Sequence, residues 1–417
     1  MTGTVPLEEG NRRRKKGKAG DPRDQDGKKR CITIDRAGFI HGRESRNRRC
    51  TEIKYPCFPI GQGGENTVTA EARGATGTGL MHEARQYTKL EDQVVHCSVC
   101  AHRCKIKEGG HGICGVRLNR KGILYAATYG KISAEAVDPI EKKPLFHYLP
   151  GTLSYSLGSV GCNFQCEHCQ NWHISRATLE DGLLHDLSPE EGVARALSTG
   201  SRSIAWTYNE PTIWHEYPRD MGTLARAKGL GTVYVTNGYI TEEALQDIAP
   251  MLEAFRVDLK AFSEEFYRKV CRAKLQPVLD ASKKARELGM HIETVTLVIP
   301  GLNDTMEEME GLIRWVVENL GPATPMHFSR FHPDYRMRDR EPTPVATLEK
   351  ICRRAKELGI RFPYLGNVPG HPLENTYCPK CGALLIERSG YQTRFRGLKG
   401  TTCGECGEVI EIRQAAR

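Results

Sequence analysis

Short apolar runs alternate with amphipathic stretches of helical period between residues 150 and 370. The apolar runs predict strands at 153–160, 202–208, 231–237, 254–260, 292–299, 326–332 and 361–366. Helix start signals stand between them: a proline and a glutamate follow Ser188, and Glu308 lies three residues after Thr305. This alternation indicates βαβ units, so we predict an α/β fold with a partial, TIM-like (β/α) barrel over residues 151–370. In parallel barrels the active site forms at the carboxyl ends of the strands.

Residues 1–80 lack this pattern. They hold 17 Lys/Arg and 10 Asp/Glu of the chain's 60 and 51, so most of the net charge of +9 lies in this segment. Such a composition buries too little apolar surface to fold, and we predict a disordered basic extension. Our hypothesis is that Met81, where sequence favouring a helix begins, is the native start; the alternative is a genuine basic tail that binds acidic partners. The nearly neutral remainder gives no case for nucleic-acid binding.

Cysteine usage and hydropathy predict the compartment. No apolar run approaches the roughly 18–20 residues of a membrane span, and the basic run at 12–18 leads into no apolar core of a secretory signal. Of 16 cysteines, most fall into three tight sets with the spacing of metal ligands. That usage is typical of a reducing compartment, so we expect a cytoplasmic protein with no membrane partner.

The central cysteine set follows the first predicted strand. Cys162, Cys166 and Cys169 have the spacing C-x3-C-x2-C. Three thiolates on one loop can hold three irons of a [4Fe–4S] cube, which leaves the fourth iron open to a substrate or cofactor. S-adenosylmethionine chelated there could accept one electron and release a 5′-deoxyadenosyl radical. A zinc knuckle or buried structural thiols are the alternatives.

Two further sets flank the predicted barrel. In an N-terminal cysteine-rich module at 81–150, the four ligand candidates are Cys97, Cys100, Cys104 and Cys114. Their spacing among glycines fits structural zinc or a second iron–sulfur cluster, and does not separate the two. In a C-terminal module at 371–417, the candidates are Cys378, Cys381, Cys403 and Cys406. Two C-x2-C knuckles predict a zinc ribbon.

The cluster loop resembles that of the radical S-adenosylmethionine enzymes, and its continuation through Trp172 looks like the pyruvate formate-lyase activating branch. His168 departs from this branch, which has an aromatic residue there. The resemblance implies a barrel of radical SAM type and cofactor contacts at the strand ends. Those contacts would come from Asn209, Glu210, Asn237, Asp258, Lys260 and His332. The alternatives are a helix-initiating loop at 209–212, a buried Asp258–Lys260 ion pair and a structural role for His332.

Residues 81–406 together resemble the radical SAM member of the AmmeMemoRadiSam system, through the N-terminal cysteines, the stretch 138–147 and the stretch 375–379. This resemblance implies Memo-like and AMMECR-like partners, and an electron donor such as ferredoxin or flavodoxin. We expect reductive cleavage of S-adenosylmethionine and hydrogen abstraction from an unknown substrate or partner protein, with the polar loop 334–341 as a substrate lid. Activation of a glycyl-radical enzyme is the first alternative. A non-catalytic, metal-stabilised nucleic-acid or scaffold protein is the second.

Overall fold

The computed structural model describes residues 33–34, 40–41 and 81–414 of the chain, which divides into two units, 1–75 and 76–417. In the first unit β1 (Thr33–Ile34) pairs antiparallel with β2 (Ile40–His41). The disorder predicted for 1–80 otherwise concerns residues outside the described ones. Within the described residues, no helix has the length and apolar character needed to cross a membrane.

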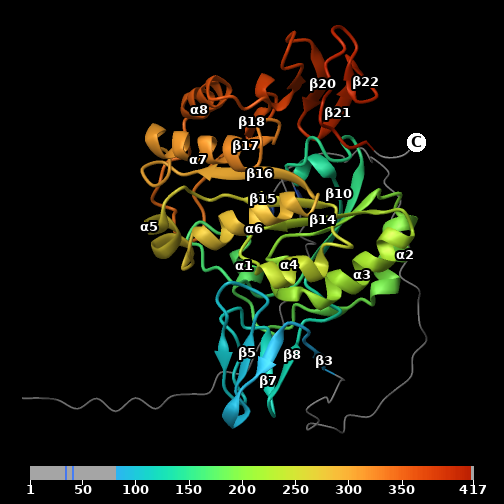
Figure 1. Ribbon diagram of the computed structural model, residues 1–417, viewed down its shortest axis with the longest axis vertical. Helices are drawn as coiled ribbons and strands as arrows, with labels where there is room; N and C mark the ends of the chain where they lie inside the picture. Colours follow the sequence, from blue (N-terminus) through green and yellow to red (C-terminus); the bar gives the residue numbers. More distant parts are fainter. Residues whose placement is uncertain (1–32, 35–39, 42–80, 415–417) are drawn as a thin grey trace, which may run out of the picture. The chain divides into compact units, whose positions relative to one another are not determined.

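A mixed eight-stranded sheet forms the centre of the second unit (Figure 1). Its order is β10 (Ala134–Pro139), β11 (Leu153–Gly158), β13 (Ser203–Trp206), β14 (Gly231–Thr236), β15 (Ala254–Asp258), β16 (His291–Val298), β17 (Met326–Arg330) and β18 (Pro363–Gly366). The strands from β11 onward are parallel, and each lies within one of the predicted segments or one residue beyond it. The sequence prediction missed β10, which is antiparallel to β11. Within the described residues no ladder joins β10 to β18, so the sheet is open.

Helices follow the parallel strands and pack on them (Figure 1). They are α2 (Pro189–Ser198), α3 (Glu216–Ala227), α4 (Glu242–Ile248), α6 (Gln276–Glu287), α7 (Met306–Asn319) and α8 (Val345–Glu357). Both predicted capping residues act as such: the hydroxyl of Ser188 accepts from the Glu191 amide, and that of Thr305 from the Glu308 amide.

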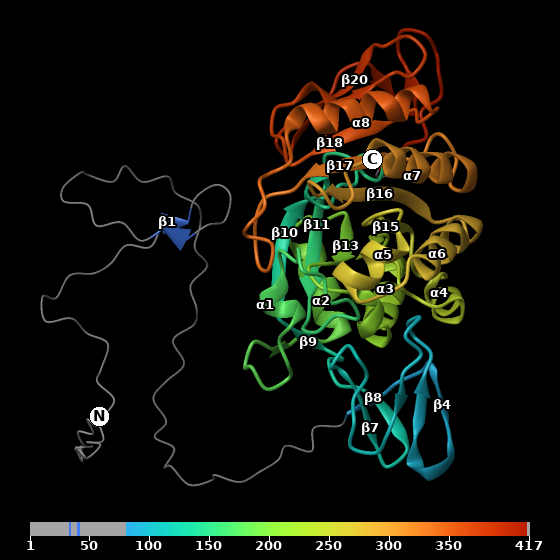
Figure 2. The same ribbon diagram turned by 90° about the vertical axis from the view of Figure 1, so that its left-hand side faces the viewer.

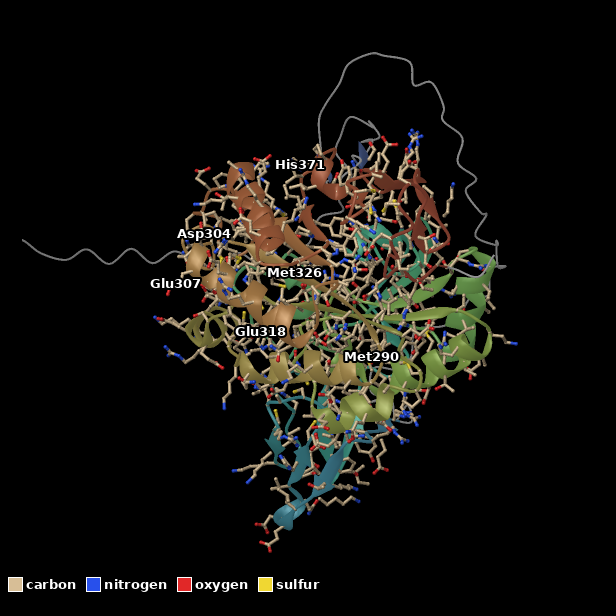
Figure 3. All side chains as sticks on the ribbon, turned by 45° about the horizontal axis from the view of Figure 1, so that its top comes forward. Met290, Asp304, Glu307, Glu318, Met326 and His371 are labelled. Atoms are coloured by element: carbon tan, nitrogen blue, oxygen red, sulfur yellow. The ribbon has the colours of Figure 1, made fainter. Side chains whose placement is uncertain are left out.

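Acidic residues lie near both ends of helix α7. Asp304 and Glu307 lie at its amino end and Glu318 near its other end (Figure 3). Carboxylates are favoured beside the positive end of a helix dipole. Met290 and Met326, just before β16 and at the start of β17, are buried and fill the core at the amino ends of those strands (Figure 3).

The N-terminal module corrects one prediction. The helix expected after Met81 is absent: residues 82–83 and 87–89 are strands. Two small antiparallel sheets form here, β3 (His82–Glu83)–β8 (Ile123–Ala126)–β7 (Arg117–Arg120) and β4 (Tyr87–Lys89)–β5 (Val95–Cys97)–β6 (Lys105–Ile106). The first strand pairs with one about forty residues downstream. That long-range ladder overrides the local preference for a helix.

The C-terminal module holds a three-stranded sheet, β19 (Thr376–Tyr377), β20 (Leu384–Ser389) and β21 (Gln392–Phe395), and a pair, β22 (Leu398–Lys399) and β23 (Thr402–Cys403). Buried Leu385 and Ile386 pack with Phe362 and Tyr364 at the edge of the central sheet. The two cysteine-rich modules lie at opposite ends of the second unit (Figure 1 and Figure 2).

Candidate active site and metal centres

The loop with Cys162, Cys166 and Cys169 begins directly after β11, at the carboxyl end of the parallel strands. Gly161 enters it at φ +82°, a conformation that favours glycine. The backbone amides of Gln165 and Glu167 donate to carbonyls of a π-helical turn, Tyr267–Cys271, at 2.9 and 3.1 Å. These bonds hold the loop at the carboxyl ends of the parallel strands.

A cavity of about 530 Å³ opens beside this loop, and all three thiols line it. The predicted contacts that also line it are Asn209, Glu210, Asn237, Asp258 and Lys260. In the described part of the chain the three thiols do not form a set within 4.8 Å of one another. Three cysteines on one loop beside a cavity offer the donor set of a [4Fe–4S] cluster, so the residues fit such a cluster.

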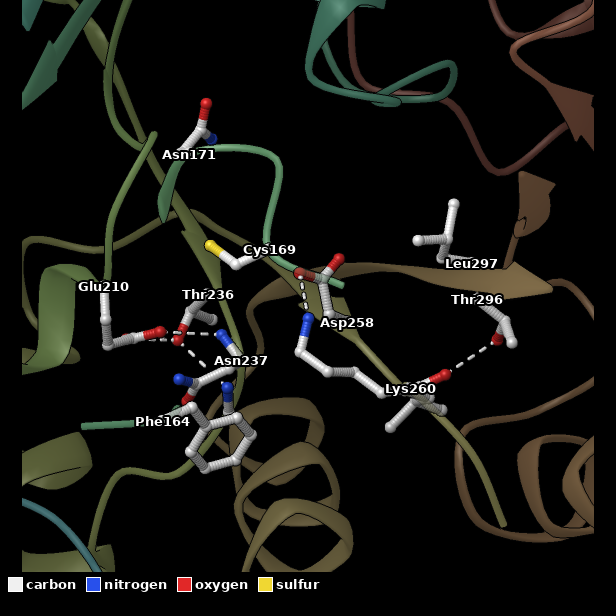
Figure 4. Close-up of polar contacts among 12 residues, drawn as sticks. Phe164, Cys169, Asn171, Glu210, Thr236, Asn237, Asp258, Lys260, Thr296 and Leu297 are labelled. Carbon is white, nitrogen blue, oxygen red and sulfur yellow. Dashed lines mark hydrogen bonds and ion pairs between the residues drawn. The ribbon is translucent and has the colours of Figure 1, made fainter. Parts of the chain in front are cut away.

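Glu210 forms the acidic part of the cavity wall (Figure 4). Its carboxylate accepts hydrogen bonds from the Thr212 amide at 3.0 Å, the Thr236 hydroxyl at 2.6 Å and the Asn237 amide at 2.8 Å. The side chain is buried, and burial raises the pKa of Glu210. The three donors hold the carboxylate in one position, at the ends of β13 and β14, where it can accept from an ammonium group.

The two asparagines predicted as cofactor contacts mainly support the loop. Asn209 accepts from the Ser159 amide at 3.1 Å and donates to the Gly161 carbonyl at 3.0 Å. Asn237 donates to the side chain of Asn163 at 2.8 Å. Both side chains thus hold the loop around Cys162 in place. This role is additional to the cofactor contacts predicted from the sequence.

Asp258 ends β15 and Lys260 lies two residues beyond it, with their charged groups 3.0 Å apart (Figure 4). Arg256 pairs with the same carboxylate. Burial alone would raise the pKa of Asp258, but the two cations outweigh it and lower that pKa. The ion-pair interpretation is confirmed, and because both residues also line the cavity, their contact with the cofactor stays a prediction.

His332 lies outside the cavity lining. It is exposed, and its ring approaches the side-chain amide of Gln170 at 3.3 Å. The adjoining loop 334–341 contacts the cluster loop: Tyr335 stacks on Trp172 in α1 (Trp172–Ser175) with 5.2 Å between ring centres, and the Arg336 amide donates to the Glu167 carbonyl. The loop predicted as a lid is therefore in position beside the cysteines.

Cys271 is a site residue that the sequence analysis missed. Its spacing marks it only as an apolar position, yet its thiol is in hydrogen-bond contact with Cys166 and its carbonyl accepts from Gln165 at 2.9 Å. Burial raises the pKa of Cys271 well above its usual value. Cys271 itself is not among the residues that line the cavity.

The N-terminal cysteines lie against the cluster loop. A Cβ atom on Gly161 would come within 2.5 Å of the Cys114 carbonyl oxygen, and His102 Nε2 is 2.8 Å from the Asn163 carbonyl. The Cys97 amide donates to the Cys104 carbonyl at 2.9 Å, which brings the first and third cysteines of the set together. In the described residues no three of these sulfurs lie within 4.8 Å of one another. Zinc and a second iron–sulfur cluster both remain interpretations of this set.

The C-terminal cysteines are compact. Their four sulfur atoms all lie within 4.8 Å of one another, with 3.6 Å between Cys378 and Cys406 and 3.7 Å between Cys381 and Cys403. Four thiolates about 2.3 Å from one zinc ion stand about 3.8 Å apart. The set therefore fits a single tetrahedral metal ion.

Comparison with known proteins agrees with this geometry. The Radical SAM superfamily matches residues 157–316. The chain belongs to this superfamily, and so is an enzyme of radical chemistry whose cofactors are S-adenosylmethionine and an iron–sulfur cluster. Its family includes the uncharacterized protein MJ0808 of Methanocaldococcus jannaschii, which is 46% identical over 334 residues, 80% of this chain and 99% of the relative.

More distant similarities are weaker. The uncharacterized protein MJ0674 of the same organism is 22% identical over 58% of this chain and 68% of its own length. A domain of a pyruvate-formate lyase-activating enzyme from Bacteroides vulgatus has a TM-score of 0.36 at 13% identity, covering 40% of this chain and 99% of that domain. A radical SAM methyltransferase from Sphaerobacter thermophilus has a TM-score of 0.40 at 16% identity, covering 52% and 66%.

Proposed function

We propose that the protein binds a [4Fe–4S] cluster through Cys162, Cys166 and Cys169, cleaves S-adenosylmethionine reductively, and abstracts hydrogen from a substrate in the adjoining cavity. The observation that carries this proposal is the shared lining: three thiols, one fixed carboxylate and one ion pair face the same 530 Å³ space. When bound, the cluster and cofactor together supply a carbon radical strong enough to take hydrogen from an unactivated carbon.

The chain's own residues hold the cofactor. The Glu210 carboxylate, held by three internal donors, accepts from the ammonium of the methionyl group. Asp258 accepts from ribose hydroxyls, and Lys260 donates to the methionyl carboxylate across their 3.0 Å ion pair. Asn209 and Asn237 keep the loop in register with these groups. Buried Cys271 donates its S–H to Cys166, which withdraws charge from that thiolate.

The remaining parts of the prediction stay proposals. We place zinc in the C-terminal set, supported by its compact tetrahedral sulfurs. Memo-like and AMMECR-like partners, a ferredoxin or flavodoxin donor and a cytoplasmic location rest on the sequence alone. Activation of a glycyl-radical enzyme stays the alternative substrate assignment. A non-catalytic role has no support from the superfamily match.

Anaerobic reconstitution tests the proposal. The protein should gain about four irons and four sulfides at the central loop. With reductant it should then convert S-adenosylmethionine into 5′-deoxyadenosine and methionine. Glu210→Gln should raise the KM for S-adenosylmethionine about tenfold or more, because a charged hydrogen bond is lost. Glu242→Gln, on exposed α4, is the matched control. Absence of cleavage by a fully reconstituted enzyme would refute the proposal.

A further inference from the structure

The stretch 138–147, notable in the sequence but without a role in cofactor binding, closes the other side of the cavity. β10 runs antiparallel to β11, with Asp138 opposite Ser154 near the first residue of β11. The cluster loop follows the last residue of that same strand. Lys142, Lys143 and Pro144 therefore line the cavity from the side of the amino ends of the strands, facing the cysteines at the carboxyl ends.

Cations exceed carboxylates on this side of the cavity. The Asp138 carboxylate forms ion pairs with the Lys142 ammonium at 2.9 Å and the Lys143 ammonium at 2.5 Å. It also accepts a hydrogen bond from the Tyr208 hydroxyl at 2.7 Å. One carboxylate thus serves two ammonium groups. Asp258 likewise serves both Arg256 and Lys260. Each of these two groups thus holds two cations around one carboxylate, and among the residues that line the cavity only Glu210 offers a further carboxylate.

An excess of positive charge costs folding free energy here, because two of the cations are buried. Lys143 is only 3% exposed, and Arg256 only 8%. Burying a cation without a full counter-charge is unfavourable unless a ligand completes it. Burial lowers the pKa of Lys143 to about 8, which still leaves the ammonium form in excess at pH 7. The side chains of Lys143 and Arg256 nevertheless both line the cavity.

Tyr208 connects the two sides of the cavity. Its backbone carbonyl accepts from Asn171 of the cluster loop at 2.8 Å, while its hydroxyl reaches Asp138. Its ring lies under the Lys143 ammonium, 4.6 Å from the ring centre. Its φ of +70° is unusual for a residue other than glycine. Tyr208 thus links Lys143 to the cluster loop through Asn171.

We infer that Lys142 and Lys143, with Arg256 beside them, bind an anionic group of a small-molecule substrate, a carboxylate or a phosphate, and so hold the rest of that molecule toward the cysteines. This inference rests on the proposed function and names the chemical class of its substrate. The methionyl carboxylate is assigned to Lys260 on the other side, so Lys142 and Lys143 remain for the substrate.

Binding of simple anions to the reconstituted full-length enzyme tests the inference. The probes are inorganic phosphate and acetate, titrated by calorimetry with S-adenosylmethionine present and against sodium chloride of equal ionic strength. Saturable binding of one probe is expected in the wild-type enzyme, and the probe that binds identifies the anion class. Lys142→Gln and Lys142→Glu should weaken it at least tenfold. Lys142 has a half-exposed side chain, so these variants should fold.

Lys131→Gln is the matched control, because Lys131 is also a partly exposed, ion-paired lysine but lies away from the cavity. It should bind the probe as the wild type does. Equal binding by the Lys142 variants, or no saturable binding of either probe by the wild type, would overturn the inference. Formation of 5′-deoxyadenosine by the wild type is measured in parallel, so a failure of the proposed function is seen separately from a failure of anion binding.

Discussion

The two four-cysteine modules look alike in sequence and differ in the structure. The C-terminal set brings its four sulfurs within 4.8 Å of one another, at the end of the unit away from the cluster loop. The N-terminal set shows no such compact group among the described residues, yet Cys114 abuts Gly161 and His102 contacts Asn163. Spacing therefore predicts that both modules bind metal, but only tertiary contact shows that the N-terminal module abuts the cluster loop and that the C-terminal module adds Tyr391 to the cavity wall.

The modules are also attached by different forces. Arg117 in the N-terminal module forms a fully buried ion pair with Glu216 of α3 at 2.7 Å. In the C-terminal module Arg388 is buried over the Phe146 ring at 4.0 Å and donates to the Phe146 carbonyl at 2.9 Å. We expect damage to the first module to reach the cluster loop, and damage to the second to reach the cavity wall through Tyr391 with a smaller effect on that loop.

The largest expected effect sets the baseline for this comparison. Cys166→Ala removes one of the three loop thiols, so formation of 5′-deoxyadenosine should be abolished while metal at both flanking modules is retained. Chromatography of the nucleoside product and metal analysis of the same sample measure both quantities. Residual cleavage with a complete cluster would contradict the ligand assignment.

Gly161→Ala tests the contact between the N-terminal module and the loop. The new Cβ would stand 2.5 Å from the Cys114 carbonyl oxygen, so the loop must shift, and a shift of about 1 Å at a reacting group can cost about 100-fold in rate. Gly200→Ala is the control: its φ of +70° is similar, but a Cβ there meets nothing within 4 Å. Equal cleavage rates for the two variants would show that the contact is unimportant.

Glu216→Gln tests the attachment of the N-terminal module. Leaving Arg117 buried without its partner should cost about 3–5 kcal/mol of unfolding free energy, and cleavage should fall about tenfold as the cluster loop loosens. Chemical denaturation measures the first effect and product formation the second. Glu242→Gln on the exposed surface of α4 should change stability by less than about 0.5 kcal/mol.

The same ion pair predicts a pH dependence. Burial alone would raise the pKa of Glu216, but Arg117 and His215 lower it to about 2. The unfolded value is about 4.3, so the pair's stabilisation is fully present above about pH 5 and is lost as the pH falls toward 2. Unfolding free energy should fall more steeply over this range in the wild type than in Glu216→Gln. Parallel curves would argue against the buried ion pair.

Cys381→Ser should have the smallest effect on catalysis. The C-terminal metal should be lost and the melting temperature should fall, because metal binding and folding are coupled in such modules. Cleavage should fall less than in Gly161→Ala, because this module lines the cavity through Tyr391, whereas Gly161 enters the cluster loop itself. Metal analysis, calorimetry and product formation give the three values. A loss of cleavage as large as in Gly161→Ala would contradict the expected difference between the two modules in their effect on catalysis.

Much of this protein was already determined by its sequence. The seven parallel strands and the capping residues Ser188 and Thr305 followed from local periodicity, because these signals lie within a few neighbouring residues. The compact C-terminal cysteine set followed from the spacing of its two C-x2-C pairs. The match of residues 157–316 to the Radical SAM superfamily agrees with the loop's three thiols.

Only the tertiary structure decided the rest. Strand β3 replaced an expected helix because its partner is far along the chain, and Cys271 became a neighbour of Cys166 through a π-helical turn that no spacing announces. Likewise Lys142 and Lys143 face the cavity only because the antiparallel strand β10 folds back onto β11. Periodicity and spacing are local, whereas the position of a charge beside a cavity depends on packing between segments that are distant in sequence.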